Sequence, residues 1–301
     1  MEKTVFYRDS LITDLAKNSI CLTGIGRSGT TILGAIVHSF NNVEYAFEPP
    51  ELIPLFHFIE SIPVEIWRYL YEYYLFEGIF SGSLSGRTLN FNESDWSCVF
   101  RAKTKEEVEK RMSSSLRRHE ILKLIDGRCV AYKIPNILNR IDKLNSIYPD
   151  IKSICTIRHP DEVVRSTLER GWYRSPLNLA VMRNTAFGPI PAYMDESNAQ
   201  RWLSLTEIDK CYDSFCKVYS EQYLTDQLCI IDFARFCNNP YEICINLAKR
   251  LGKEYSKMTE QLLKTIKKPE FQIDNLIGYE SSSRDKALEI YKIWLDKAVL
   301  I

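Results

Sequence analysis

The sequence predicts an α/β protein in which helices cover both faces of a central parallel sheet, giving three layers. Five short runs rich in branched and aromatic residues alternate along the chain with helical patterns. Both faces of each run are apolar, which is typical of strands buried inside a parallel sheet. A glycine-rich turn between the first run and the following helical pattern is the third observation that favours this fold.

The five predicted strands are SICLTG (19–24), VEYAF (43–47), CVAYKI (129–134), SICTIR (153–158) and LCIIDF (228–233). Apolar residues at helical spacing follow the first, third and fifth strands, over 32–40, 137–144 and 239–252. The last of these patterns has Pro240 in its first turn and Gly252 at its end, which are helix start and stop signals. This alternation implies crossover connections and therefore parallel strands.

Two segments interrupt the alternation. Residues 50–127 are predicted to be a helical, aromatic insertion, and residues 171–197, with three prolines and Gly188, are predicted to be a loop. Further helices are expected over 255–301. With no repeat or low-complexity linker, the sequence predicts a single domain, 1–301, with its core over about 19–252.

Composition narrows the function. The chain has 301 residues, with 39 Lys and Arg against 39 Asp and Glu, and this zero balance argues against a nucleic-acid binder. No apolar stretch is long enough for a membrane span, and charges near the N-terminus argue against a signal peptide. The nine cysteines are scattered without a C-x-x-C pair, so we expect buried thiols, no metal site and a cytoplasmic location.

The glycine-rich turn GIGRSGTT (24–31) nearly fits two nucleotide-binding patterns. Gly24, Gly26 and Gly29 match the G-x-G-x-x-G of dinucleotide-binding proteins, although that pattern is common by chance. The spacing of Gly24 and Gly29 also fits a P-loop, but Thr30 stands where an NTPase has its lysine. In either case, backbone N–H groups at a helix N-terminus would form an anion site.

A second strand–turn–helix follows in SICTIRHPDEVVRSTLERGW, where Arg158 ends the strand and Ser166 lies on the helix. Together, RSGTT (27–31) and this second motif resemble the sulfotransferase family, whose donor is 3′-phosphoadenosine-5′-phosphosulfate (PAPS). VAYKIP (130–135) and the segment 228–252 resemble further parts of that family, so the resemblance covers about Ser19 to Gly252. His159 departs from it, because an acidic residue is commoner there.

The resemblance implies a P-loop-like fold and a binding site in two parts. The 5′-phosphosulfate loop would be formed by Gly26, Arg27, Ser28, Gly29, Thr30 and Thr31. The 3′-phosphate would be held by Arg158 and Ser166, since a guanidinium and a hydroxyl both donate to phosphate oxygens. The product would be adenosine 3′,5′-bisphosphate (PAP), and the donor would need no metal.

The resemblance also suggests three catalytic residues. Arg27 would neutralise the leaving phosphate, and Glu48 at the end of the second strand would be the general base. Lys133, at the end of the third strand, would stabilise the moving sulfonate oxygens or position the acceptor. Glu48 could instead form a structural ion pair. Trp172 and Tyr173 could stack on adenine or simply pack in the core.

The sequence therefore predicts transfer of a sulfuryl group to a hydroxyl or amine of a small molecule or carbohydrate. Three alternatives remain, two of them enzymes. A P-loop nucleotide kinase or phosphotransferase is disfavoured by Thr30, and a dinucleotide oxidoreductase is disfavoured by the second phosphate motif. Outside enzymes, a non-catalytic nucleotide-binding module would keep the phosphate contacts without needing Glu48 or Lys133.

Overall fold

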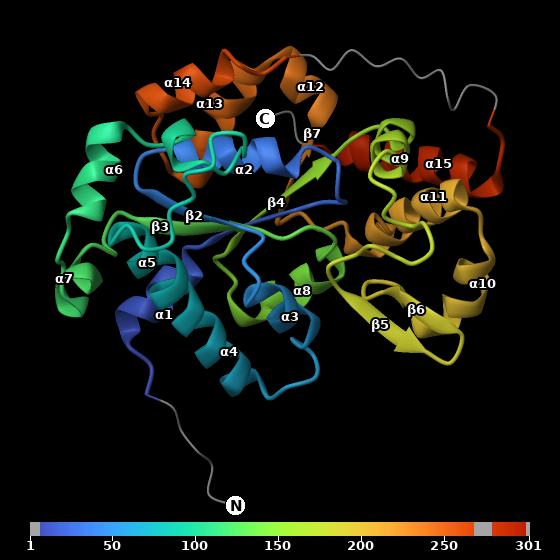
Figure 1. Cartoon of the computed structure of the whole chain (residues 1–301), viewed down its shortest axis with the longest axis horizontal. Coiled ribbons are helices and arrows are strands. Elements are labelled where there is room, and N and C mark those ends of the chain that lie inside the picture. The colour runs from blue at the N-terminus through green and yellow to red at the C-terminus, as the bar shows by residue number, and fades with distance from the viewer. Residues whose placement is uncertain (1–6, 268–278, 299–301) are drawn as a thin grey trace, which may run out of the picture.

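The computed structural model describes residues 7–267 and 279–298. Its centre is a sheet with strand order β2-β3-β1-β4-β7, in which every pair of neighbours is parallel (Figure 1). The strands are β1 (Ile20–Thr23), β2 (Val43–Phe47), β3 (Cys129–Lys133), β4 (Lys152–Ile157) and β7 (Leu228–Asp232). All five predicted strands are present to within one or two residues at their ends, and the predicted fold class is confirmed.

Helices cover both faces of this sheet. One face carries α2 (Thr30–Ser39), α12 (Phe233–Asn238), α13 (Pro240–Leu251) and α14 (Lys257–Leu263). The other carries α1 (Ser10–Lys17), α4 (Val64–Tyr73), α8 (Leu138–Ile147), α9 (Pro160–Leu168), α11 (Glu207–Val218) and α15 (Ser282–Lys297). Strand side chains alternate between the two cores: Cys21 packs on one side, and Ile20 and Leu22 on the other.

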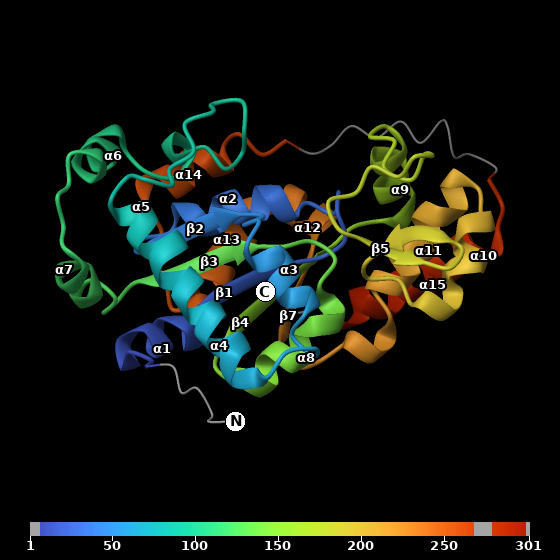
Figure 2. The same ribbon diagram turned by 60° about the horizontal axis from the view of Figure 1, so that its bottom comes forward.

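The insertion after β2 is helical, as predicted. It contains α3 (Leu52–His57), α4, a π-helix (Tyr74–Ser81), α5 (Gly82–Leu84), a 3₁₀ turn (Val99–Arg101), α6 (Lys105–Met112) and α7 (Arg118–Lys123). Figure 2 shows α6 and α7 at one end of the molecule and α10 (Ala199–Ser204) at the other. Two further 3₁₀ turns span Glu196–Asn198 and Glu221–Tyr223.

The segment 171–197 differs from the prediction, because it is not all loop. It contains an antiparallel hairpin of β5 (Met182–Thr185) and β6 (Gly188–Pro191), joined by a two-residue turn. The prolines and glycine concealed this ribbon, since both are usually depleted in strands. The Thr185 hydroxyl donates a hydrogen bond to the carbonyl of Gly188 across the turn, at 2.7 Å.

Two predictions from composition can be compared with the described residues. All nine cysteines lie within them, and each is buried and outside any disulfide. Across 7–267 and 279–298, no helix combines the length and the apolar character that crossing a bilayer would require. The helices expected over 255–301 include α14 and α15, while 268–278 and 299–301 lie outside the described residues.

Candidate functional site

The two phosphate motifs lie side by side because β1 and β4 are neighbours in the sheet. Thr23 at the end of β1 is in register with Cys155 of β4, so the turn after β1 and Arg158 after β4 emerge at the same sheet edge. The connection that leaves β1 leads to β2, on one side of β1 in the sheet. The connection that leaves β3 leads to β4, on the other side of β1. In open α/β sheets, such a change of direction is where ligands usually bind.

The turn after β1 depends on backbone conformations that favour glycine. Gly24 has φ 138° and Gly29 has φ 97°, and Arg27 between them is itself left-handed, at φ 73°. Gly29 also has no room for a side chain, because a Cβ there would lie 2.1 Å from the Phe233 ring. The turn is thus held tightly against the start of α12.

Hydrogen bonds beneath the turn fix its shape. Ser28 Oγ donates to the Ile25 carbonyl at 2.7 Å and shares a hydrogen bond with Thr156 Oγ1 at 2.8 Å. Tyr219 Oη accepts from the backbone N–H of Ile25 at 3.0 Å and donates to the Thr156 carbonyl at 2.7 Å. The Ser28 side chain therefore faces inward, and a ligand would have to contact Ser28 through its backbone.

The outer side of the turn meets α2. Thr30 and Thr31 are the first two residues of that helix, where backbone N–H groups lack helical partners and favour an anion. The N–H of Gly26 donates to Asn136 Oδ1 at 3.2 Å. Trp172 packs directly over Gly26, since a Cβ there would lie 2.7 Å from the indole.

Residues of the two motifs contact each other directly. Arg27 Nε donates to Ser166 Oγ at 2.9 Å, and Arg158 Nη1 donates to the carbonyl of Arg27 at 2.9 Å. Arg158 also pairs with Glu162, at 2.8 Å, and its guanidinium lies 5.1 Å from the centre of the Phe233 ring. Arg27 lies 131 residues from Arg158 and 139 residues from Ser166 along the chain, and the three form one cluster.

The cluster is electropositive. Burial lowers the pKa of the Arg27 guanidinium, and the charges of Arg170 and Arg158 lower it further, while Glu169 opposes them. Gathering like charges in a half-buried place is unfavourable unless an anion binds there. The electrostatics of this site therefore suit a phosphorylated ligand.

Glu48 and Lys133 face each other at the ends of β2 and β3. Their side chains form an ion pair, and the Glu48 N–H donates to the Lys133 carbonyl at 2.9 Å. Lys133 is buried, with its ammonium 4.4 Å from the centre of the Phe47 ring. Burial lowers its pKa more than Glu48 raises it. Glu48 and Lys133 thus lie at the strand ends, as the sequence indicated. Their ion pair is the structural alternative that the sequence left open for Glu48.

Sequence reasoning missed two residues beside Glu48. A cavity of about 70 Å³ is lined by Glu48, His57 and Asn136, with Tyr193 from the second insertion. Burial lowers the pKa of the His57 imidazole, helped by the charges of Arg140 and Arg183. His57 had no spacing signal within its helical segment. Asn136 has a left-handed backbone, φ 63°, three residues after the end of β3, and an Asn directly after Lys-Ile-Pro is the one local hint.

The two aromatic residues after the second motif differ. Trp172 is half-buried over the turn, where it could meet a ligand. Tyr173 is buried, and its hydroxyl is hydrogen-bonded to that of Tyr193 at 2.6 Å. Tyr173 therefore packs in the core, which was the alternative to stacking on adenine.

The fold and the site define an α/β protein with a cationic anion-binding turn at the carboxyl edge of a parallel sheet. The model of the sulfotransferase family matches residues 19–257. This match covers well over half of the sequence, so the chain belongs to the sulfotransferase family. No curated protein sequence matches the chain.

Solved structures of sulfotransferase domains are similar to this chain. The sulfotransferase domain from the curacin biosynthetic pathway aligns with a TM-score of 0.53 at 13% identity, over 92% of this chain and 96% of that one. The sulfotransferase domain of the Synechococcus PCC 7002 olefin synthase is 16% identical, with a TM-score of 0.45 over 92% of this chain and 94% of that one. At 13% identity, the similarity to the domain from the curacin pathway shows a shared fold and nothing more.

Proposed function

We propose that the protein transfers a sulfuryl group from PAPS to a hydroxyl group of a small-molecule or carbohydrate acceptor. The observation that carries the proposal is the direct contact between the two phosphate motifs, with Arg27 Nε on Ser166 Oγ and Arg158 on the Arg27 carbonyl. A nucleotide phosphorylated at both its 5′ and 3′ positions matches two adjoining cationic sites, one at Arg27 and one at Arg158. Thr30, in place of a P-loop lysine, weakens the kinase alternative.

The residues present fit such a donor. The N–H groups at the start of α2, with the Thr30 and Thr31 hydroxyls, would hold its 5′-phosphate. Arg158 and Ser166 would hold the 3′-phosphate. PAPS supplies an activated sulfuryl group whose departure leaves PAP. Arg27 would stabilise the charge that develops on the bridging oxygen as the S–O bond breaks.

Glu48 and Lys133 would act on the acceptor side. Glu48 would accept the proton of the attacking hydroxyl, while Lys133 would turn from Glu48 toward the sulfuryl oxygens. The cavity beside Glu48 has room for the reacting hydroxymethyl of an acceptor. His57 lines the same cavity, and its lowered pKa favours the neutral imidazole, so it is the second candidate for the base.

Ligand-induced thermal shifts test this proposal. PAP should raise the melting temperature, because a ligand at 100 times its Kd stabilises the folded state by about 2.7 kcal/mol. ATP with magnesium, and NAD, should each raise it far less. Arg158→Ala should weaken the response to PAP at least about tenfold, and Arg250→Ala, at an exposed position of α13, should not.

Turnover is the second readout. Labelled PAPS incubated with a metabolite extract should yield a sulfated product, and a chelator should leave the rate unchanged. Binding of PAP without turnover on any acceptor would favour the non-catalytic module. A larger thermal shift with ATP and magnesium than with PAP would overturn the donor assignment.

A further inference from the structure

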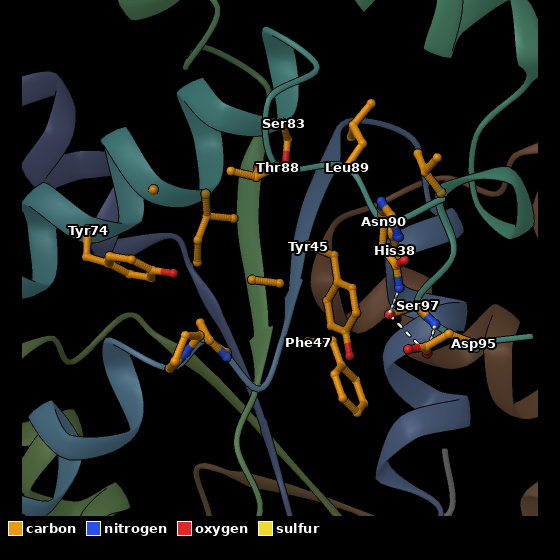
Figure 3. A pocket seen from close by; sticks show the side chains of 16 residues that line it. His38, Tyr45, Phe47, Tyr74, Ser83, Thr88, Leu89, Asn90, Asp95 and Ser97 are labelled. Atoms are coloured by element: carbon orange, nitrogen blue, oxygen red, sulfur yellow. Dashed lines mark hydrogen bonds between the residues drawn. The ribbon is translucent and has the colours of Figure 1, made fainter. Parts of the chain in front are cut away.

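A second, larger cavity lies along β2, the edge strand of the sheet (Figure 3). Its volume is about 270 Å³, just below the range of about 300–1,000 Å³ typical of sites for drug-sized ligands. Tyr45 and Phe47 of β2, Tyr74 of the π-helix and the loop from Thr88 to Val99 line it. None of the residues beside Glu48 in the smaller cavity lines this one. The size suits a small molecule.

Aromatic rings form much of the wall. Tyr45, Phe47 and Tyr74 line the cavity, and Tyr74 is the first residue of the π-helix, a distortion that often occurs at functional sites. The Phe47 ring already attracts a cation, since the Lys133 ammonium lies 4.4 Å from its centre. Aromatic faces of this kind stabilise ammonium groups through the ring quadrupole.

A carboxylate, that of Asp95, lines the cavity on the side of Tyr45 and Phe47, away from Tyr74 (Figure 3). Ser97 donates to Asp95 Oδ1 through its backbone N–H at 2.8 Å and its hydroxyl at 3.0 Å, and Asn90 Nδ2 donates to Ser97 Oγ at 2.8 Å (Figure 3). These contacts fix the orientation of the Asp95 carboxylate. Among the described residues, they use Oδ1 and leave Oδ2 without a hydrogen bond.

The lining is otherwise uncharged. Asp95 carries the only formal charge among the described residues that line the cavity, because burial, Lys103 and Arg111 hold the His38 pKa well below its usual value. Burial, with the nearby charges of Glu48 and Asp95, raises the pKa of Tyr45, which keeps its proton. Among the lining residues, a bound cation would therefore meet one carboxylate and no cation. The Lys133 ammonium on the Phe47 ring does not line the cavity, and its charge is paired with Glu48.

Two buried polar atoms add to this picture. His38 Nδ1 and Tyr45 Oη have no hydrogen-bond partner in the described chain, although the two residues are only 5% and 8% exposed. Unsatisfied buried polar groups are rare in native proteins and call for an occupant that can hydrogen-bond, such as water or a ligand. The cavity is therefore suited to a polar occupant.

We propose that this cavity binds the ammonium group of a small organic amine, with Asp95 Oδ2 accepting its hydrogen bond and the rings of Tyr45 and Phe47 beside it. The site is distinct from the cavity beside Glu48. It is a proposal about binding and does not depend on the sulfuryl transfer proposed above.

A matched pair of probes tests it. Benzylamine and benzyl alcohol have the same shape, but only the amine is a cation at neutral pH. Calorimetric titration of the full chain should give at least about tenfold tighter binding for the amine. Asp95→Asn keeps an oxygen for the Ser97 contacts and should reduce this preference to about twofold or less, without weakening the binding of the alcohol.

Two further variants sharpen the result. Asp126→Asn, at an exposed position, should keep the full preference, and Phe47→Leu should reduce amine binding through the loss of one ring. Equal affinity for the two probes, no binding of the amine, or an amine preference that survives Asp95→Asn would each overturn the proposal. Circular dichroism of each variant confirms that the folded chain is being measured.

Discussion

At the scale of single residues, the carboxyl edge of the sheet brings together groups that the sequence places far apart. Lys133 and Glu48 come from strands 85 residues apart and form an ion pair, and Arg27 and Ser166 are hydrogen-bonded across 139 residues. Each contact follows from the register of neighbouring strands. The sequence could not show which role each residue of a pair has, because that depends on side-chain orientation.

The base is the first prediction at this scale. If Glu48 accepts the proton, Glu48→Gln should lower kcat by about 10²–10⁴-fold, the usual contribution of general-base catalysis. His57→Asn should then change kcat by less than about tenfold. PAP binding should survive both changes, since neither residue belongs to the phosphate motifs.

The opposite ranking would assign the base to His57. In that case the rate of the wild type should fall only below about pH 6.5, because protonation of a histidine whose pKa is lowered occurs below its ordinary value. His119→Asn, at an exposed histidine of α7, is the matched control. Equal losses from Glu48→Gln and His119→Asn would remove Glu48 from catalysis.

At the scale of elements, the packing of α2 on β2 is unusually close. Gly34 lies in the middle of α2, and a Cβ there would be 2.1 Å from the Tyr45 hydroxyl. Alanine is normally preferred to glycine inside a helix by about 1 kcal/mol. Here the helix would have to move away from the strand, so close packing outweighs helix propensity.

We therefore expect Gly34→Ala to lower the free energy of unfolding by about 1–3 kcal/mol, as overpacking does in well-filled cores. Urea denaturation measures this change. In a Tyr45→Leu background the same substitution should cost less, because the ring it meets is gone. A Gly34→Ala protein as stable as the wild type would show that α2 shifts freely.

How far the sequence reached is also clearest at this scale. The five strands were predictable because branched and aromatic runs carry their own signal, and the turn because its glycines and Arg27 have fixed spacing. The hairpin β5–β6 was hidden by its prolines, and the π-helix has no local signature in its aromatic run. His57 joins the site only through the packing of α3 beside β3.

At the scale of the whole molecule, the C-terminal helix supports the second phosphate motif. Arg284 of α15 donates to both carboxylate oxygens of Asp161, at 3.1 and 2.8 Å, and Tyr212 of α11 adds a third hydrogen bond at 2.7 Å. These hydrogen bonds lower the pKa of Asp161 even though its burial raises it. Asp161 lies on α9, the helix that carries Ser166.

Arg284→Met should therefore destabilise the protein by about 1–3 kcal/mol, because Asp161 loses its cationic partner while it stays buried. Chemical denaturation at neutral pH gives this value. Arg284→Lys should recover part of it, and Arg250→Ala, on an exposed face of α13, should change little. An unchanged denaturation midpoint for Arg284→Met would show that α15 is held by its apolar face alone.

The hydrogen bond from Arg27 to Ser166 has a consequence for selectivity. If Ser166 holds the 3′-phosphate as proposed, the bound nucleotide must separate these two side chains, and its 3′-phosphate would offer Ser166 a new partner. An adenosine 5′-phosphosulfate without that phosphate would break the contact and leave the hydroxyl unmatched. On the proposed function, the protein would thus discriminate against the incomplete donor before any acceptor arrives.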